Sequence, residues 1–140
     1  MINMKLNWKA IGAAFVATTI ISIICGIYLP KNVDLIGPVI GGFIAGYMVR
    51  GSYTDGLVNG GIPAGIGGIV STLTLVLLSS SQITSLVYSL GYTGSKEMLF
   101  VGLLVGSAFA GFALFFVLGI VGSIIGAVLN RRNQSNTINP

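Results

Sequence analysis

The chain has 140 residues, of which 54% are hydrophobic and only 7% are charged, and its formal net charge is +4. Soluble globular domains carry about a quarter charged residues, so this composition argues against a surface built for water. The chain has no histidine and the single Cys25, which excludes an intramolecular disulfide and argues against zinc or redox-iron sites. We therefore expect no metal site and no cofactor.

The charged side chains divide the sequence into four long uncharged stretches. These stretches hold 21, 15, 40 and 33 residues and lie between Lys9 and Lys31, Asp34 and Arg50, Asp55 and Lys96, and Glu97 and Arg131. About 20 apolar residues in a helix cross the hydrocarbon core of a bilayer. The sequence predicts an all-α integral membrane bundle, one domain over residues 1–130, with transmembrane helices over about 9–29, 33–50, 56–78 and 98–129.

The first two predicted spans differ in how well they fit a bilayer. Trp8 and Tyr28 lie at the two ends of the first span, where aromatic rings prefer the headgroup layer. The second span has only 15 uncharged residues, about 22 Å of helix against a core of about 30 Å. Snorkelling of its flanking basic side chains can close this gap, and a re-entrant hairpin is the alternative.

The third span begins at a predicted N-cap, Thr54 or Asp55, and contains Pro63 among several glycines. Because proline has no N–H group, it frees the carbonyl of Asn59 and predicts a kink. The serine-rich segment 79–97 has apolar residues at helical spacing, which predicts an interfacial amphipathic helix, with a partly ordered external loop as the alternative.

The fourth span, over 98–129, is longer than the hydrocarbon core and must tilt or protrude. It is followed by a polar tail over 131–140, which has too little apolar content to fold. If both termini are cytoplasmic, five of the seven basic residues lie inside, in agreement with the positive-inside rule. We therefore predict a cell-membrane protein with both termini in the cytoplasm and the lipid bilayer as its partner. The basic residues are too scattered for nucleic acid.

Glycines recur four residues apart in three of the spans, in the manner of a glycine zipper. Such rows let helix backbones approach closely in lipid. The predicted packing glycines are Gly37, Gly41, Gly42 and Gly46 in the second span, Gly56, Gly60, Gly61, Gly65 and Gly68 in the third, and Gly102, Gly106, Gly122 and Gly126 in the fourth. These rows are consistent with helix contacts within one chain. The alternative is that the long fourth helix also packs against another protomer or another membrane protein.

The stretch Gly41–Val70 reads GGFIAGYMVRGSYTDGLVNGGIPAGIGGIV. With its GGFIAGY motif, a short polar turn and DG-x-x-NG before a glycine-rich helix, the chain resembles a family of small multi-pass archaeal membrane proteins classed as a domain of unknown function. The resemblance covers roughly residues 5–125. It implies a four-helix membrane protein and no activity, so it supplies no site residues. Pro63 departs from the pattern, where glycine or alanine is expected.

These patterns favour a non-enzymatic structural or partner-binding membrane unit that is assembled through glycine-mediated helix packing. The alternative is a small oligomeric channel or carrier with a polar gate near Asn59 and Pro63. Against transport, every ionisable residue lies at the end of a segment, whereas ion pathways place such residues inside the membrane. A lipid-modifying enzyme is a more distant alternative, because the spans contain no acid, base or metal ligand set.

Overall fold

A computed structural model describes residues 6–29, 33–49 and 53–138, and every element in these ranges is helical. The predicted all-α class is therefore confirmed for this part of the chain. The elements are α1 (Trp8–Tyr28), the 3-10 helix η1 (Val33–Leu35), α2 (Ile36–Met48), α3 (Tyr53–Leu78), α4 (Ser80–Ser89) and α5 (Lys96–Ile138).

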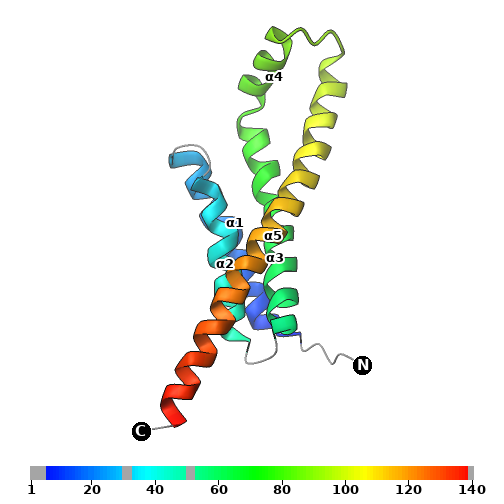
Figure 1. The fold of residues 1–140 in the computed structure, drawn as a ribbon. Coiled ribbons are helices and arrows are strands. Elements are labelled where there is room, and N and C mark those ends of the chain that lie inside the picture. The colour runs from blue at the N-terminus through cyan, green and yellow to red at the C-terminus, as the bar shows by residue number, and fades with distance from the viewer. Residues whose placement is uncertain (1–5, 30–32, 50–52, 139–140) are drawn as a thin grey trace.

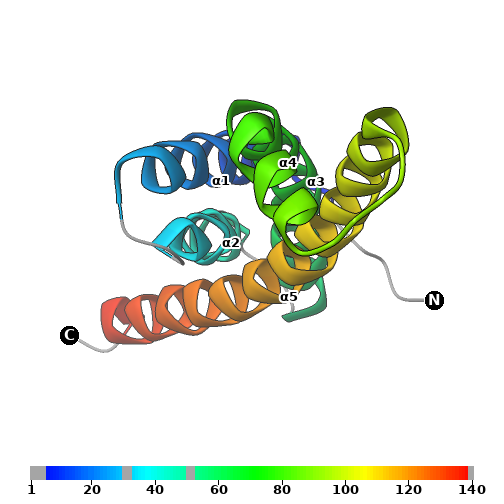
Figure 2. The ribbon, with the colours of Figure 1, turned by 90° about the horizontal axis from the view of Figure 1, so that it is seen from above.

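The helices form two regions (Figure 1). In the bundle, α1, α2, α3 and the part of α5 from Gly111 onward pack against one another. The arm, residues 80–110, contains α4 and the first part of α5, and it extends past the ends of α1 and α2. Seen from above, α2 lies between α1 and the second half of α5 (Figure 2). The start of α1 and the end of α5 lie at the same end of the bundle.

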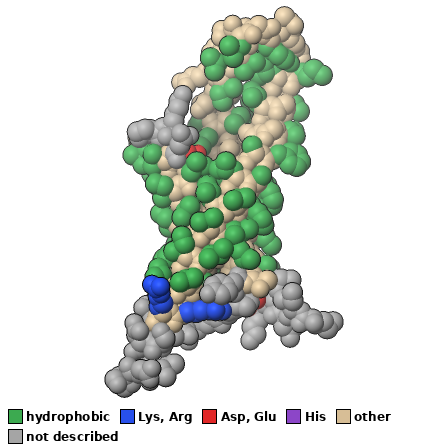
Figure 3. Space-filling model, in the orientation of Figure 1, with side chains coloured by type: hydrophobic (Ala, Val, Ile, Leu, Met, Phe, Trp, Pro, Cys, Tyr) green, Lys and Arg blue, Asp and Glu red, His purple; other side chains and the backbone are tan. Residues whose placement is uncertain are grey.

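Within the described part of the chain, three helices are long and apolar enough to cross a membrane, namely Trp8–Tyr28, Thr54–Leu78 and Lys96–Arg132. Hydrophobic side chains cover the face shown in Figure 3 from the bundle to the arm. These features indicate a membrane location. The apolar helix Val33–Met48 is shorter, about 24 Å at 1.5 Å per residue, so the fourth span stays a prediction.

The starts of α1 and α3 differ in how they compare with the sequence. Asn7 caps α1, because its side-chain oxygen accepts a hydrogen bond from the Ala10 N–H at 3.3 Å. The predicted cap of α3 at Thr54 or Asp55 is wrong, since the helix already begins at Tyr53 and both residues lie in its first turn. An acidic side chain there still complements the positive end of the helix dipole. α3 continues as a single helix through Pro63.

The helix predicted within segment 79–97 is present as α4, so the alternative of a loop throughout is wrong. Instead of turning aside, α4 continues beyond the end of α3 (Figure 1). Gly91, with φ of 93°, adopts the left-handed conformation that commonly ends a helix. Its N–H donates to the Tyr88 carbonyl at 3.1 Å, and the chain then turns toward α5.

α5 has 43 residues, about 64 Å of helix, and is the longest element. Its backbone remains helical to Ile138, so the prediction that the tail from residue 131 does not fold is wrong for residues 131–138. The reason lies in the backbone, because residues 127–138 contain no glycine or proline to stop a helix that is already nucleated.

Candidate functional site

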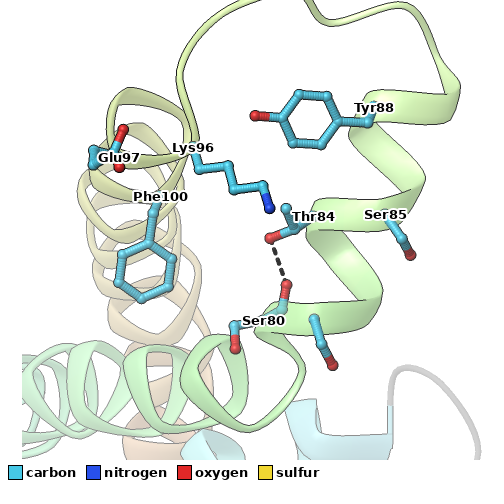
Figure 4. Close-up of a pocket in the computed structure, with 8 residues that line it drawn as sticks. Ser80, Thr84, Ser85, Tyr88, Lys96, Glu97 and Phe100 are labelled. Atoms are coloured by element: carbon cyan, nitrogen blue, oxygen red, sulfur yellow. Dashed lines mark hydrogen bonds between the residues drawn. The ribbon is translucent and has the colours of Figure 1, made fainter.

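A polar hollow of about 650 Å³ lies between α4 and the first turns of α5 (Figure 4). This volume falls in the range of about 300–1,000 Å³ that small-molecule sites occupy. The lining residues are Ser80, Ser81, Thr84, Ser85, Tyr88, Lys96, Glu97 and Phe100. The hollow therefore combines a row of hydroxyl groups on one wall with two charged side chains and an aromatic ring on the other.

Helical spacing brings the hydroxyl groups of α4 to this wall. Thr84 donates from its hydroxyl to the Ser80 carbonyl at 2.6 Å, and Tyr88 donates to the Gly94 carbonyl at 3.2 Å. Lys96 reaches across the hollow toward Thr84, whereas Glu97 lies on the side of α5 away from α4 (Figure 4). The lining therefore offers a ligand one cation, one carboxylate and several hydroxyls.

Asn59 and Pro63, the predicted polar gate, are both buried in the bundle. The Asn59 amide nitrogen donates to the Asp55 carbonyl at 2.6 Å, and its side-chain oxygen accepts from the Asn7 N–H at 2.8 Å. Asn59 thus ties the start of α1 to the start of α3. Pro63 lines an apolar groove of about 290 Å³ between these two helices, together with residues such as Trp8. A gate at this position stays a prediction.

The α2 and α5 backbones touch directly at four glycines. A side-chain carbon added at Gly42 would collide with the Gly119 carbonyl, and one at Gly46 would collide with the Ser123 carbonyl. In the reverse direction, Gly122 and Gly126 meet the carbonyls of Val39 and Phe43. At this approach, Cα–H groups can donate weak hydrogen bonds to carbonyl oxygens, each worth about 0.5–1 kcal/mol.

The other row of α2 glycines faces α1. A side-chain carbon at Gly37 would lie 2.9 Å from the Thr18 carbonyl oxygen, and one at Gly41 would lie 2.7 Å from the Ala14 carbonyl oxygen. Next to these glycines, the Ser22 hydroxyl donates to the Asp34 carbonyl at 2.8 Å, which holds η1 against α1. The two rows of α2 therefore meet two different helices.

The predicted glycines of α3 meet α5. Ser123 of α5 is buried, and its hydroxyl donates to the Gly56 carbonyl. A side-chain carbon at Gly60 would lie 2.6 Å from the Ser123 Cβ, and one at Gly68 would lie 2.6 Å from the Phe115 Cβ. Gly61 and Gly65 contact the side chains of Ile120, Phe112 and Phe116.

Gly102 and Gly106, in the arm, differ from the rest of the predicted set. A side-chain carbon at either position would have nothing within 4 Å. Met98 and Phe109, which lie on the same side of α5 at helical spacing, are 74% and 75% exposed. These two glycines pack against no described residue, and a role between molecules stays a prediction.

Sequence reasoning missed several glycines that also make close contacts, among them Gly26 of α1, where a side-chain carbon would lie 2.8 Å from the Leu75 Cδ1 of α3. Gly111 and Gly119 of α5 contact α3, and Gly67 of α3 contacts Thr18 of α1. Two of them could have been predicted if serine is included among the small residues, because Gly67 and Ser71, and likewise Gly119 and Ser123, lie four residues apart. The hollow was also missed, because its two walls come together only through the turn after α4.

The helices and these contacts define an all-helical protein suited to a membrane. The chain belongs to a family of unknown function, DUF5518, whose model matches residues 8–129. The predicted membership in a family of unknown function is thus confirmed, while the archaeal origin stays a prediction. No curated protein and no solved structure matches the chain.

Proposed function

We propose that this protein is a non-enzymatic membrane unit that binds a partner through its arm. The proposed partner is a second copy of the same chain. The bundle is held together by glycine contacts within the chain. The observation that supports this proposal is a contrast along α5. Gly102 and Gly106, in the arm, have open space, whereas the glycines of the bundle part touch other helices, namely Gly111, Gly119, Gly122 and Gly126.

Physical chemistry supports a protein partner for the arm face of α5. Each glycine inside a helix costs about 1 kcal/mol relative to alanine, and lipid gives nothing specific in return. Small residues four apart let a second helix approach closely enough for van der Waals contact. Gly102 and Gly106, flanked by the exposed side chains of Met98 and Phe109, provide such a face.

The proposal includes four spans in the cell membrane with both termini in the cytoplasm. In support, Lys9 near the start of α1 and Arg131 and Arg132 near the end of α5 lie at the same end of the bundle, where basic side chains gather in Figure 3. Labelling of single cysteines introduced at Ser135 and Gly91, after Cys25→Ser, tests this orientation. Accessibility of position 135 from outside the cell contradicts it.

Disulfide crosslinking in native membranes tests self-association. In a Cys25→Ser background, Gly106→Cys is expected to give a covalent dimer, because two arms in contact bring the two thiols together. The matched control is Val117→Cys in the bundle part of the same helix, where the side chain is 58% exposed and should stay uncrosslinked. Equal crosslinking at both positions, or a monomer at both, contradicts the proposal.

A further inference from the structure

We propose that the hollow between α4 and α5 binds a phosphate group, and that the phosphate belongs to the headgroup of a membrane lipid. The positive charge that would bind phosphate is the ammonium group of Lys96. This group makes no hydrogen bond or ion pair with a described residue, and it reaches into the hollow (Figure 4). An ammonium group with three donors is a common partner for phosphate oxygens.

The hydroxyl wall complements this cation. Ser80 and Ser81 both line the hollow and can each donate from the hydroxyl to a phosphate oxygen. Thr84 and Tyr88 already donate to backbone carbonyls, so they serve as the polar boundary of the site. Glu97 also lines the hollow and would repel an anion, but its side chain points away from α4, whereas that of Lys96 points toward it (Figure 4).

The surroundings of the hollow favour a lipid over free phosphate. Phe100 contributes an apolar surface to the hollow itself. The arm also exposes apolar side chains, Val101 and Val105 on α5 and Leu86 on α4. An amphiphile matches this pairing, with its phosphate at Lys96 and its chains along the arm. This assignment of the source rests on the proposed membrane location, whereas the phosphate chemistry does not.

Binding to the full-length protein in non-ionic detergent tests the site, with native mass spectrometry as the readout. The probes are phosphatidylglycerol, diacylglycerol as a lipid without phosphate, and inorganic phosphate. Phosphatidylglycerol should bind, and Lys96→Gln should weaken it about fivefold, the upper value for an exposed ion pair. Lys96→Arg keeps the charge and should stay within about twofold of the wild type.

Two control variants separate the site from general attraction to anions. Lys9→Gln removes an exposed lysine at the other end of the molecule and should change binding by less than about twofold. Glu97→Gln removes the nearest negative charge and should tighten binding. Unchanged melting temperatures for all four variants show that they fold.

The outcomes distinguish the two phosphate sources. Tight binding of phosphatidylglycerol with weak binding of inorganic phosphate supports the lipid headgroup. Inorganic phosphate that binds as tightly as the lipid, and depends on Lys96, keeps the phosphate site and overturns the lipid source. Equal binding of diacylglycerol, or equal effects of Lys96→Gln and Lys9→Gln, overturns the whole proposal. Crosslinking at Gly106 does not depend on any of these results.

Discussion

The bundle and the arm contain the same small residues but use them in opposite ways. In the bundle, the α2 glycines Gly42 and Gly46 lie directly against the α5 backbone, and a buried serine donates to a carbonyl of α3. In the arm, Gly102 and Gly106 face open space, and α4 makes few contacts with α5. The hydroxyl groups of the arm line a hollow instead of a helix interface.

This comparison shows that spacing alone does not determine what a glycine does. A pair four apart marks a smooth face on a helix, and the length of the neighbouring helices decides whether the face is covered. α1 and α2 have 21 and 13 residues, whereas α5 has 43. Among the described helices, the part of α5 beyond their ends therefore has only α3 and α4 beside it (Figure 1).

The largest expected effect comes from filling a backbone contact. Gly46→Ala places a methyl group against the Ser123 carbonyl, with the carbonyl carbon at 2.7 Å, and neither helix can move without disturbing others. We expect the free energy of unfolding in detergent to fall by about 1–3 kcal/mol. Gly106→Ala in the arm and Gly12→Ala in α1 have open space and should be neutral or gain up to about 1 kcal/mol. Similar losses at all three positions break the comparison.

An intermediate effect is expected at the tie between α1 and α3. Asn59→Ala leaves the part-buried Asn7 N–H without its acceptor, which should lower the free energy of unfolding by about 1–2 kcal/mol. Hydrogen exchange at the start of α1 should rise in parallel. Asn130→Ala is the control, since its bond to the Tyr47 carbonyl is exposed and water can replace it. A larger loss at Asn130 than at Asn59 contradicts this assignment.

The smallest expected effect on stability distinguishes two serines of α5, one in the bundle and one in the arm. Ser123→Ala removes the hydroxyl that donates to the Gly56 carbonyl of α3, and hydrogen bonds between membrane helices average about 0.6 kcal/mol. Ser107→Ala in the arm removes only a bond to the Leu104 carbonyl of its own helix and should cost almost nothing. Chemical unfolding in mixed micelles measures both. The reverse order of effects contradicts the assignment of Ser123 to the bundle contact.

Much of this architecture can be predicted from local patterns in the sequence. Charge-free stretches predict the apolar helices, and the aromatic residues Trp8 and Tyr28 coincide with the first and last residues of α1. The α2 glycines were predicted as packing residues, because residues four apart lie on the same side of a helix. The partner of each row depends on the tertiary arrangement, so it came only from the structure.

The corrections have physical reasons as well. α3 begins at Tyr53, so Thr54 and Asp55 lie inside its first turn and their preference for cap positions did not decide the boundary. At the other end, polar composition predicted an unfolded tail, yet polar residues can extend an existing helix at little cost. The hollow could not be predicted, because Lys96 and Ser80 are brought together by the turn at Gly91.

The position of α2 between α1 and α5 has a consequence for how the protein is made. The ribosome completes α1 and α2 early, so Gly37 and Gly41 can find α1 at once. Gly42 and Gly46 have to wait for Gly119 and Ser123, which are synthesised more than 70 residues later by the numbering of the chain. Until then this short helix depends on lipid or on the insertion machinery to cover its second face, and the last helix to emerge completes the burial of one of the first.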